Sequence, residues 1–176
     1  MNIQIGQYTI RVWGPGDEAA LVKYADNRRV WINLDDIFPH PYTVADAEAW
    51  IEASAWKPVT NFAIATDDEA IGGIGLKLRK DIYRRSAEVG YWLGEPFWGR
   101  GIATAALKSI AVFAFGEFDL VRLDAHVFED NTRSARVLEK NGFRLEGRLA
   151  KSVTKDGRTF DSLLYALTRD EPKPGR

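Results

Sequence analysis

The sequence predicts a single α+β domain in which a mixed, mostly antiparallel central sheet is flanked by helices. Its length of 176 residues and apolar content of 45% suit one ordinary domain with a substantial core. Two hairpins, one on each side of the middle of the chain, predict antiparallel strands. Between them, one strand–helix–strand unit predicts a parallel pair. We expect the domain to span residues 1–168 and residues 169–176 to form a flexible polar tail.

The elements of the first half follow from apolar periodicity and turn formers. Residues 8–12 alternate and predict a strand. Asp17 is expected to cap the helix after it, which reaches Tyr24. Thr43 and Asp46 have the spacing of a capping box, which would open a second helix. The other elements expected here are a loop at residues 32–43, a hairpin of residues 61–65 and 70–76 around Asp67 and Asp68, and a strand at residues 87–93.

The second half gives equally clear patterns. A helix is expected over residues 103–115, because apolar residues recur along one face and Gly116 can end it. Residues 121–127 alternate strictly and predict a half-buried strand. Asn131 is expected to cap a further helix that stops at Asn141 and Gly142. The last predicted element is a hairpin of residues 145–153 and 159–167 that turns at Lys155, Asp156 and Gly157.

Charge and composition exclude several classes of function. With 24 basic and 25 acidic residues the net charge is -1, so neither nucleic acid nor an anionic membrane is an expected partner. The absence of cysteine excludes disulfides, thiolate zinc sites and a cysteine nucleophile, and no metal is expected. Residues 1–6 lack the features of a signal peptide, and no apolar run approaches the ~20 residues of a membrane helix. We therefore expect a cytoplasmic protein.

The most informative segment is the glycine-rich turn between the strand at residues 87–93 and the helix that follows. It consists of Phe97-Trp98-Gly99-Arg100-Gly101-Ile102-Ala103-Thr104. Glycines let the backbone turn tightly and approach a ligand closely. The start of a helix offers unpaired N–H groups and the positive end of a dipole, which suit a phosphate or pyrophosphate. Arg100 adds a positive side chain, although a glycine-rich turn that binds no ligand is an equal alternative on this pattern alone.

Two other phosphate-binding motifs fit this turn less well. A P-loop needs Gly-Lys-Ser/Thr at its end, and this triplet is absent from the segment. A dinucleotide-binding fingerprint needs a third glycine where Thr104 stands, although Glu129 meets its requirement for an acidic residue after the next strand. Because hairpins flank a single strand–helix–strand unit, a nicotinamide-dependent oxidoreductase is the weaker alternative.

Two segments resemble a known family. Residues 87–93, Ala-Glu-Val-Gly-Tyr-Trp-Leu, followed by residues 98–103, Trp-Gly-Arg-Gly-Ile-Ala, resemble the acetyl-CoA-binding motif of the GNAT acyltransferases. Residues 131–147 resemble the RimJ/RimL branch of that family, which acetylates ribosomal-protein N-termini. The order of elements also fits from about residue 8 to residue 167, so the resemblance covers nearly the whole chain.

The resemblance implies a GNAT-like domain that holds acetyl-CoA in the splay between its two central parallel strands. Acetyl-CoA would be the cosubstrate, and the acetyl group would pass directly, in a ternary complex, to a primary amine of a protein N-terminus or a small molecule. A homodimer, and a non-catalytic CoA-binding sensor on the same fold, stay open. The pyrophosphate would lie on the amides of the turn, and the pantetheine arm would pair with the end of the preceding strand. The implied cofactor-binding residues are Trp92, Leu93, Gly94, Trp98, Gly99, Arg100, Gly101, Ile102, Ala103, Thr104 and, near the thiol end of the arm, Asn131.

Two positions depart from the family pattern. Trp98 stands where the first motif position is usually Gln or Arg. Leu138 stands where a tyrosine commonly protonates the departing thiolate, and leucine cannot do so. The position that the RimJ/RimL branch offers instead is Ser134, one helical turn earlier on roughly the same face. The alternative for Ser134 is an ordinary serine of the first helical turn.

Glu88 is the candidate general base. An ammonium group must lose a proton before or during its attack on a thioester, and Glu88 is a carboxylate among apolar neighbours ahead of the turn. A solvent-facing strand residue is the alternative. In the loop, Asp35 and Asp36 would suit a cationic amine or would simply be solvated. His126 is expected to be a structural or surface residue.

Overall fold

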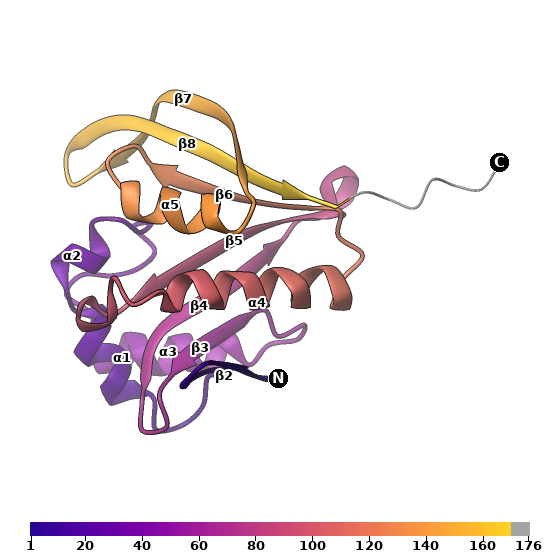
Figure 1. Cartoon of the computed structure of the whole chain (residues 1–176). Coiled ribbons are helices and arrows are strands. Elements are labelled where there is room, and N and C mark those ends of the chain that lie inside the picture. Colours follow the sequence, from indigo (N-terminus) through magenta and orange to yellow (C-terminus); the bar gives the residue numbers. More distant parts are fainter. Residues whose placement is uncertain (170–176) are drawn as a thin grey trace.

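A computed structural model describes residues 1–169 and confirms the predicted fold class (Figure 1). Within those residues, one eight-stranded sheet has the order β1-β2-β3-β4-β5-β6-β8-β7, and every neighbouring pair is antiparallel except β5 and β6. The strands are β1 (Asn2–Ile5), β2 (Tyr8–Val12), β3 (Asn61–Ala65), β4 (Ala70–Leu78), β5 (Ser86–Leu93), β6 (Arg122–Phe128), β7 (Arg144–Lys155) and β8 (Arg158–Thr168). The helices are α1 (Glu18–Ala25), α2 (Arg28–Trp31), α3 (Val44–Ser54), α4 (Ile102–Glu117) and α5 (Thr132–Lys140), with short 3-10 turns η1 (Asp81–Tyr83) and η2 (Glu95–Phe97).

Helices cover both faces of the sheet. On one face, the apolar stripe of α4 packs into the main core together with Val89 and Leu93 of β5. On the other face, α1 and α3 bury Leu21 and Ala47 in a second cluster, against which Trp92 packs. Successive strand residues point to opposite faces, so β5 presents its odd positions toward α4 and its even positions toward α1 and α3. This alternation decides which residues of β5 can act together.

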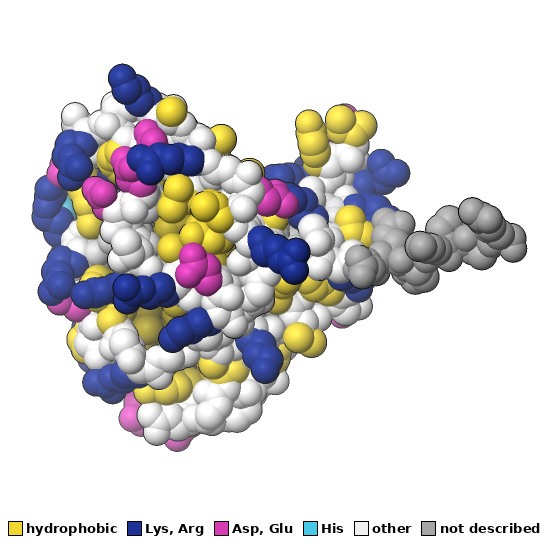
Figure 2. Space-filling view, turned by 45° about the horizontal axis from the view of Figure 1, so that its top comes forward, with side chains coloured by type: hydrophobic (Ala, Val, Ile, Leu, Met, Phe, Trp, Pro, Cys, Tyr) yellow, Lys and Arg dark blue, Asp and Glu magenta, His cyan; other side chains and the backbone are white. Residues whose placement is uncertain are grey.

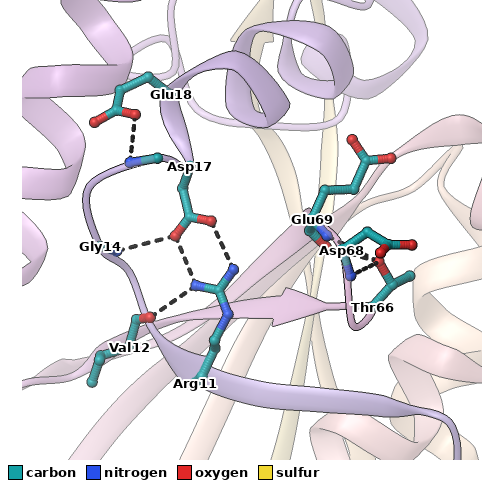
Figure 3. A network of polar contacts seen from close by, with 9 residues as sticks. Arg11, Val12, Gly14, Asp17, Glu18, Thr66, Asp68 and Glu69 are labelled. Carbon is teal, nitrogen blue, oxygen red and sulfur yellow. Dashed lines mark hydrogen bonds and ion pairs between the residues drawn. The ribbon is translucent and has the colours of Figure 1, made fainter.

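Most local predictions are confirmed. Thr43 and Asp46 form the reciprocal capping box at the start of α3, with Asp46 accepting from the Thr43 N–H at 2.8 Å. The carboxamide of Asn131 caps α5 by accepting from the N–H of Ser134 at 3.2 Å. In the predicted turn between β3 and β4, the hydroxyl of Thr66 accepts from the N–H groups of Asp68 and Glu69 at 3.3 and 3.1 Å (Figure 3). The turn between β7 and β8 also lies where it was expected.

Two predictions about helix ends need correction. Asp17 is the N-cap residue of α1, as predicted, but its carboxylate makes no capping bond to the helix. It accepts instead from both terminal nitrogens of the Arg11 guanidinium at 2.7 Å and from the N–H of Gly14 at 3.0 Å (Figure 3). Gly116 does not stop its helix, because α4 runs through Gly116 to Glu117. Phe118, whose ring lies 6.0 Å from that of Phe113, is the extended residue that ends it.

Two elements of the structure were not predicted, and part of one predicted segment is not described. The sequence patterns missed strand β1 and the single turn of helix α2. Of the predicted polar tail, residues 170–176 lie outside the described residues, and the boundary at residue 168 stays a prediction. Within residues 1–169, no helix combines the length and apolarity needed to cross a bilayer.

The parallel pair at the centre of the sheet is paired only at one end. Ser86, Ala87 and Glu88 of β5 pair with Arg122, Leu123 and Asp124 of β6. Beyond Glu88 and Asp124 the two strands run on without pairing, β5 to Leu93 and β6 to Phe128. The strands therefore form a fork that opens toward the start of α4, with Glu88 and Asp124 at its closed end.

A buried ion pair holds the closed end of the fork. The side chain of Asp124 is 1% exposed and accepts from Arg79 at 2.7 and 3.0 Å and from Arg122 at 3.1 Å. Arg122 in turn pairs with Glu146 of β7 at 2.6 Å. The network thus ties β6 to β7 and to Arg79, the residue that follows β4.

We predict that Asp124→Asn destabilises the fold by about 3 kcal/mol, because removing one charge of a buried pair leaves the partner charges uncompensated. Urea denaturation of both proteins measures the difference. Asp119→Asn is the matched control: Asp119 is 78% exposed and pairs with Arg85 at 2.9 Å, so its loss should cost at most about 1 kcal/mol. Equal destabilisation by the two substitutions would contradict the assignment.

Candidate functional site

The fork opens into a cavity with a volume of about 650 Å³. Residues 88–93 of β5 and 125–128 of β6 form its two sides. The turn after β5, the first turn of α4, the face of α5 and the segment from α2 to Asp35 complete the lining. Within residues 1–169, no group of three or more His, Asp or Glu side chains could hold a metal ion.

The glycine turn forms the open end of this cavity. Gly99 and Gly101 both have φ of +77°, a left-handed conformation that favours glycine. A Cβ placed on either residue would have no heavy atom of the described chain within 4 Å, so the space above the turn is open. Gly101 precedes the first residue of α4 and provides no side-chain cap, which leaves the first N–H groups of the helix available. The geometry suits an anion.

A row of cations on α5 faces the same open end. Arg133, Arg136 and Lys140 all line the cavity, and their spacing of three and four residues places them on one face of the helix. Asn141, which follows Lys140, donates to the carbonyl of Thr104 at 3.2 Å, so this end of α5 lies against the start of α4. Figure 2 shows Lys and Arg side chains gathered along the left side of the molecule, where Figure 1 places α2 and the start of α4. The spacing of these three cations was visible in the sequence, but none of them was predicted as a site residue.

Trp98 binds back onto the end of β5. Its indole N–H donates to the carbonyl of Leu93 at 2.6 Å. The guanidinium groups of Arg29 and Arg133 lie 5.6 and 5.1 Å from the centre of its rings, within the range of cation–π interactions. Arg29 also forms an ion pair with Glu95. The carbonyl of Leu93, at the mouth of the fork, is therefore already engaged.

Glu88 lies at the closed end of the fork. It is half-buried and lines the cavity, and no hydrogen bond or ion pair to its carboxylate occurs within residues 1–169. Its strand neighbours are Lys77 on β4 and the arginine-paired Asp124 on β6. Two positions along β5, on the same face, a Cβ on Gly90 would have no heavy atom of the described chain within 4 Å. A carboxylate without a partner in the described part of the chain therefore lies beside open space.

On the opposite face of β5, Tyr91 contacts Ser134. The phenol oxygen of Tyr91 lies 2.9 Å from the hydroxyl oxygen of Ser134 and 3.2 Å from its carbonyl oxygen. Burial raises the pKa of Tyr91 to about 12. Both residues line the cavity. Ser134 was predicted as a site residue and Tyr91 was not, because no sequence pattern indicates a contact between residues 43 positions apart.

The other predicted residues separate into two groups. Trp92, Leu93, Trp98, Gly99, Gly101, Ile102, Ala103, Thr104 and Asn131 line the cavity. Gly94 and Arg100 do not: the N–H of Gly94 donates to Ile71 at 2.8 Å, and the guanidinium of Arg100 lies over the ring of Phe97. Leu138 is fully buried.

The loop carboxylates separate in the same way. Asp35 lines the cavity. Asp36 instead accepts from the buried amine of Lys155 at 2.7 Å, which also lies 3.8 Å from the centre of the Trp31 rings. His126 is exposed and lines the cavity. A second cavity of about 300 Å³ shares Asn33 and Phe128 with the first, so the two adjoin.

Comparison with known proteins identifies the family. The acetyltransferase (GNAT) domain matches residues 7–144. The chain belongs to the GNAT acetyltransferase family. Its membership favours acyl transfer over the nicotinamide-dependent oxidoreductase that the glycine turn left open.

Individual relatives support the predicted RimJ/RimL branch. The N-acetyltransferase YokL of Bacillus subtilis, itself uncharacterized, is 28% identical over 141 residues, which is 79% of this chain and 78% of that protein. The ribosomal-protein-serine acetyltransferase of Escherichia coli is 35% identical over 109 residues, covering 62% of this chain and 60% of that protein. Several other curated relatives match over only 50% to 58% of their own length. The structure of Mycobacterium smegmatis RimJ in complex with CoA-disulfide has a TM-score of 0.78 at 30% identity, covering 92% of this chain and 81% of that one.

Proposed function

We propose that this protein transfers an acetyl group from acetyl-CoA directly to a primary amine, in a ternary complex without an acyl-enzyme. The observation that carries the proposal is the fork between β5 and β6, which has a glycine turn suited to an anion at its open end. At its closed end lies the carboxylate of Glu88, which has no hydrogen-bond or ion-pair partner among residues 1–169. An elongated ligand with phosphates at one end and an electrophile at the other matches that arrangement.

The residues of the open end fit the phosphates of CoA. The backbone N–H groups from Gly99 to Thr104 would hold the pyrophosphate, because both glycines leave the space above them open. Arg133, Arg136 and Lys140 would add positive charge from α5. Unpaired backbone groups of β5 would bind the amides of the pantetheine arm, with Asn131 near its thiol end.

The two faces of the fork supply different groups to the reaction. Acetyl-CoA brings the acetyl group as a thioester. Glu88 and Gly90 face the side of α1 and α3, where the amine would bind, and Glu88 would accept its proton directly or through water. Backbone N–H groups of β5 near Leu93 would stabilise the negative charge that develops on the carbonyl oxygen. On the opposite face, the hydroxyl of Ser134 would donate a hydrogen bond to the departing sulfur.

The acceptor that we favour is a protein N-terminus, with small-molecule amines as the alternative. The names of relatives such as the ribosomal-protein-serine acetyltransferase support this choice. The second cavity adjoining the first at Asn33 and Phe128 gives room for residues beyond the reacting amine. A thiol-release assay with a set of N-terminal peptides and small amines tests the proposal, and release with none of them would leave a CoA-binding protein without turnover.

Gly101→Asp is expected to weaken CoA binding by at least about tenfold, because it places a negative charge where the pyrophosphate would lie. Isothermal titration with CoA measures the loss. Gly101→Asn is the matched control, since asparagine tolerates the left-handed conformation about as well but carries no charge. If both variants bind CoA equally, the phosphate site lies elsewhere.

Glu88→Gln should lower turnover by ~10²–10⁴, because the variant keeps the size of the side chain but cannot accept the amine proton. The loss should shrink as the pH rises, since more of the acceptor is then already neutral. Turnover against pH, with saturating acetyl-CoA, gives both results. Glu52→Gln, a change at an exposed residue of α3, should leave the profile unchanged. Wild-type turnover in Glu88→Gln would point to another base, with Asp35 as the next candidate.

Gly90→Val should raise the KM for the acceptor and leave acetyl-CoA affinity unchanged, because its side chain would fill the open space beside Glu88. Steady-state kinetics with each substrate varied in turn separates the two effects. Gly147→Val makes the same change in β7, outside the cavity lining and also in open space, and should alter neither constant. A loss of acetyl-CoA affinity alone in Gly90→Val would place the acceptor on another face.

A further inference from the structure

We propose that Tyr91 is a positioning residue for the leaving-group step: its hydroxyl donates to the hydroxyl oxygen of Ser134 and so directs the serine hydrogen at the departing sulfur. The inference rests on the proposed function and deepens it. It assigns a role to the half-buried hydroxyl of Tyr91, which takes no part in the proposed reaction otherwise.

The distances favour donation from Tyr91 to the serine hydroxyl. Hydrogen bonds between oxygen atoms usually span 2.5–3.0 Å. The separation of 2.9 Å between the two hydroxyl oxygens falls in that range, whereas the 3.2 Å to the carbonyl of Ser134 lies beyond it. A phenol is also the more acidic of the two hydroxyls, which makes it the better donor.

The surroundings keep Tyr91 in the donating form. Its ring packs against the main core, and burial raises its pKa to about 12, so the phenol stays protonated at neutral pH. The capping bond from the N–H of Ser134 to Asn131, at 3.2 Å, fixes the start of α5 and with it the position of the serine. Tyr91 and Ser134 therefore meet from two anchored elements.

Donation from Tyr91 decides where the hydroxyl hydrogen of Ser134 points. When the oxygen of Ser134 accepts from Tyr91, its own hydrogen is free to point into the cavity, which both residues line. Accepting a hydrogen bond also polarises the serine O–H and strengthens it as a donor. As the new C–N bond forms and the C–S bond breaks, sulfur leaves with the electron pair as a thiolate and accepts from Ser134. The amine proton goes to Glu88, solvent later protonates the thiolate, and Tyr91 keeps its own proton.

Titration of the CoA thiol in its complex with the protein tests the inference without any acceptor. The ultraviolet absorbance of the thiolate is followed against pH, with the complex of desulfo-CoA as the blank. In the wild type, the pKa of the bound thiol should lie below that of free CoA. Tyr91→Phe keeps the ring and removes the hydroxyl, and should raise that pKa by about one unit, the size expected for one hydrogen bond to a charged group. Ser134→Ala should raise it by a similar amount, and the double variant by no more than either.

The controls separate failure of this inference from failure of the proposed function. Tyr83→Phe, at a tyrosine 62% exposed on η1, should leave the thiol pKa at its wild-type value. CoA affinity measured with desulfo-CoA should be unchanged in Tyr91→Phe, since desulfo-CoA has no thiolate to stabilise. If the wild type fails to bind CoA, the proposed function falls and this inference with it. If CoA binds but Tyr91→Phe leaves the thiol pKa unchanged, only the positioning role is overturned. The same holds if the pKa shifts of Tyr91→Phe and Ser134→Ala add in full in the double variant.

Discussion

The fork between β5 and β6 is the constraint on which the rest of the structure depends. Two parallel strands that pair for three residues and then separate leave a row of backbone N–H and C=O groups without their usual partners. Such a gap is stable only if other parts of the chain hold it open. Asp124, with Arg79 and Arg122, holds the closed end. Helix α4 packs against one face of β5, and α5 contacts β5 through Tyr91 and Ser134.

The fork also orders the electrostatics of the cavity. Cations from α5 gather at the open end, beside the free N–H groups of the glycine turn. The carboxylate of Glu88 stands at the closed end, and its neighbour Asp124 is already paired with two arginines, which offset its charge. A ligand with phosphates at one end and a cationic partner approaching the other would meet complementary charge at both. The same geometry keeps the carboxylate of Glu88 and the hydroxyl of Ser134 on opposite faces of β5, so that they do not hydrogen-bond to each other.

Local patterns predicted the elements of this fold better than its contacts. The hairpins, the crossover from β5 to β6 and the two caps at Thr43 and Asn131 all rest on residues close in sequence. The predicted helix end at Gly116 was wrong because glycine costs a helix only about 1 kcal/mol relative to alanine. The packing of the apolar stripe of α4 outweighs this cost. The Asp17 side chain does not cap its helix because the guanidinium of Arg11, six residues earlier, binds the carboxylate instead. The same limit applies to the site: the glycine turn and Glu88 were visible in the sequence, whereas the partner of Tyr91 lies 43 residues away.

Trp98 shows how the fold compensates for a departure from the family pattern. A tryptophan at this position removes the cation or amide that the resemblance leads one to expect. In the structure its indole N–H is fixed by the carbonyl of Leu93, and two guanidinium groups, one from α2 and one from α5, lie 5.6 and 5.1 Å from the centre of its rings. An aromatic face is attractive to guanidinium groups, so the ring holds Arg29 and Arg133 beside the glycine turn without neutralising either. Positive charge is thus retained at the open end of the fork by Arg133 of α5, whereas the charge of Arg29 is offset by its ion pair with Glu95.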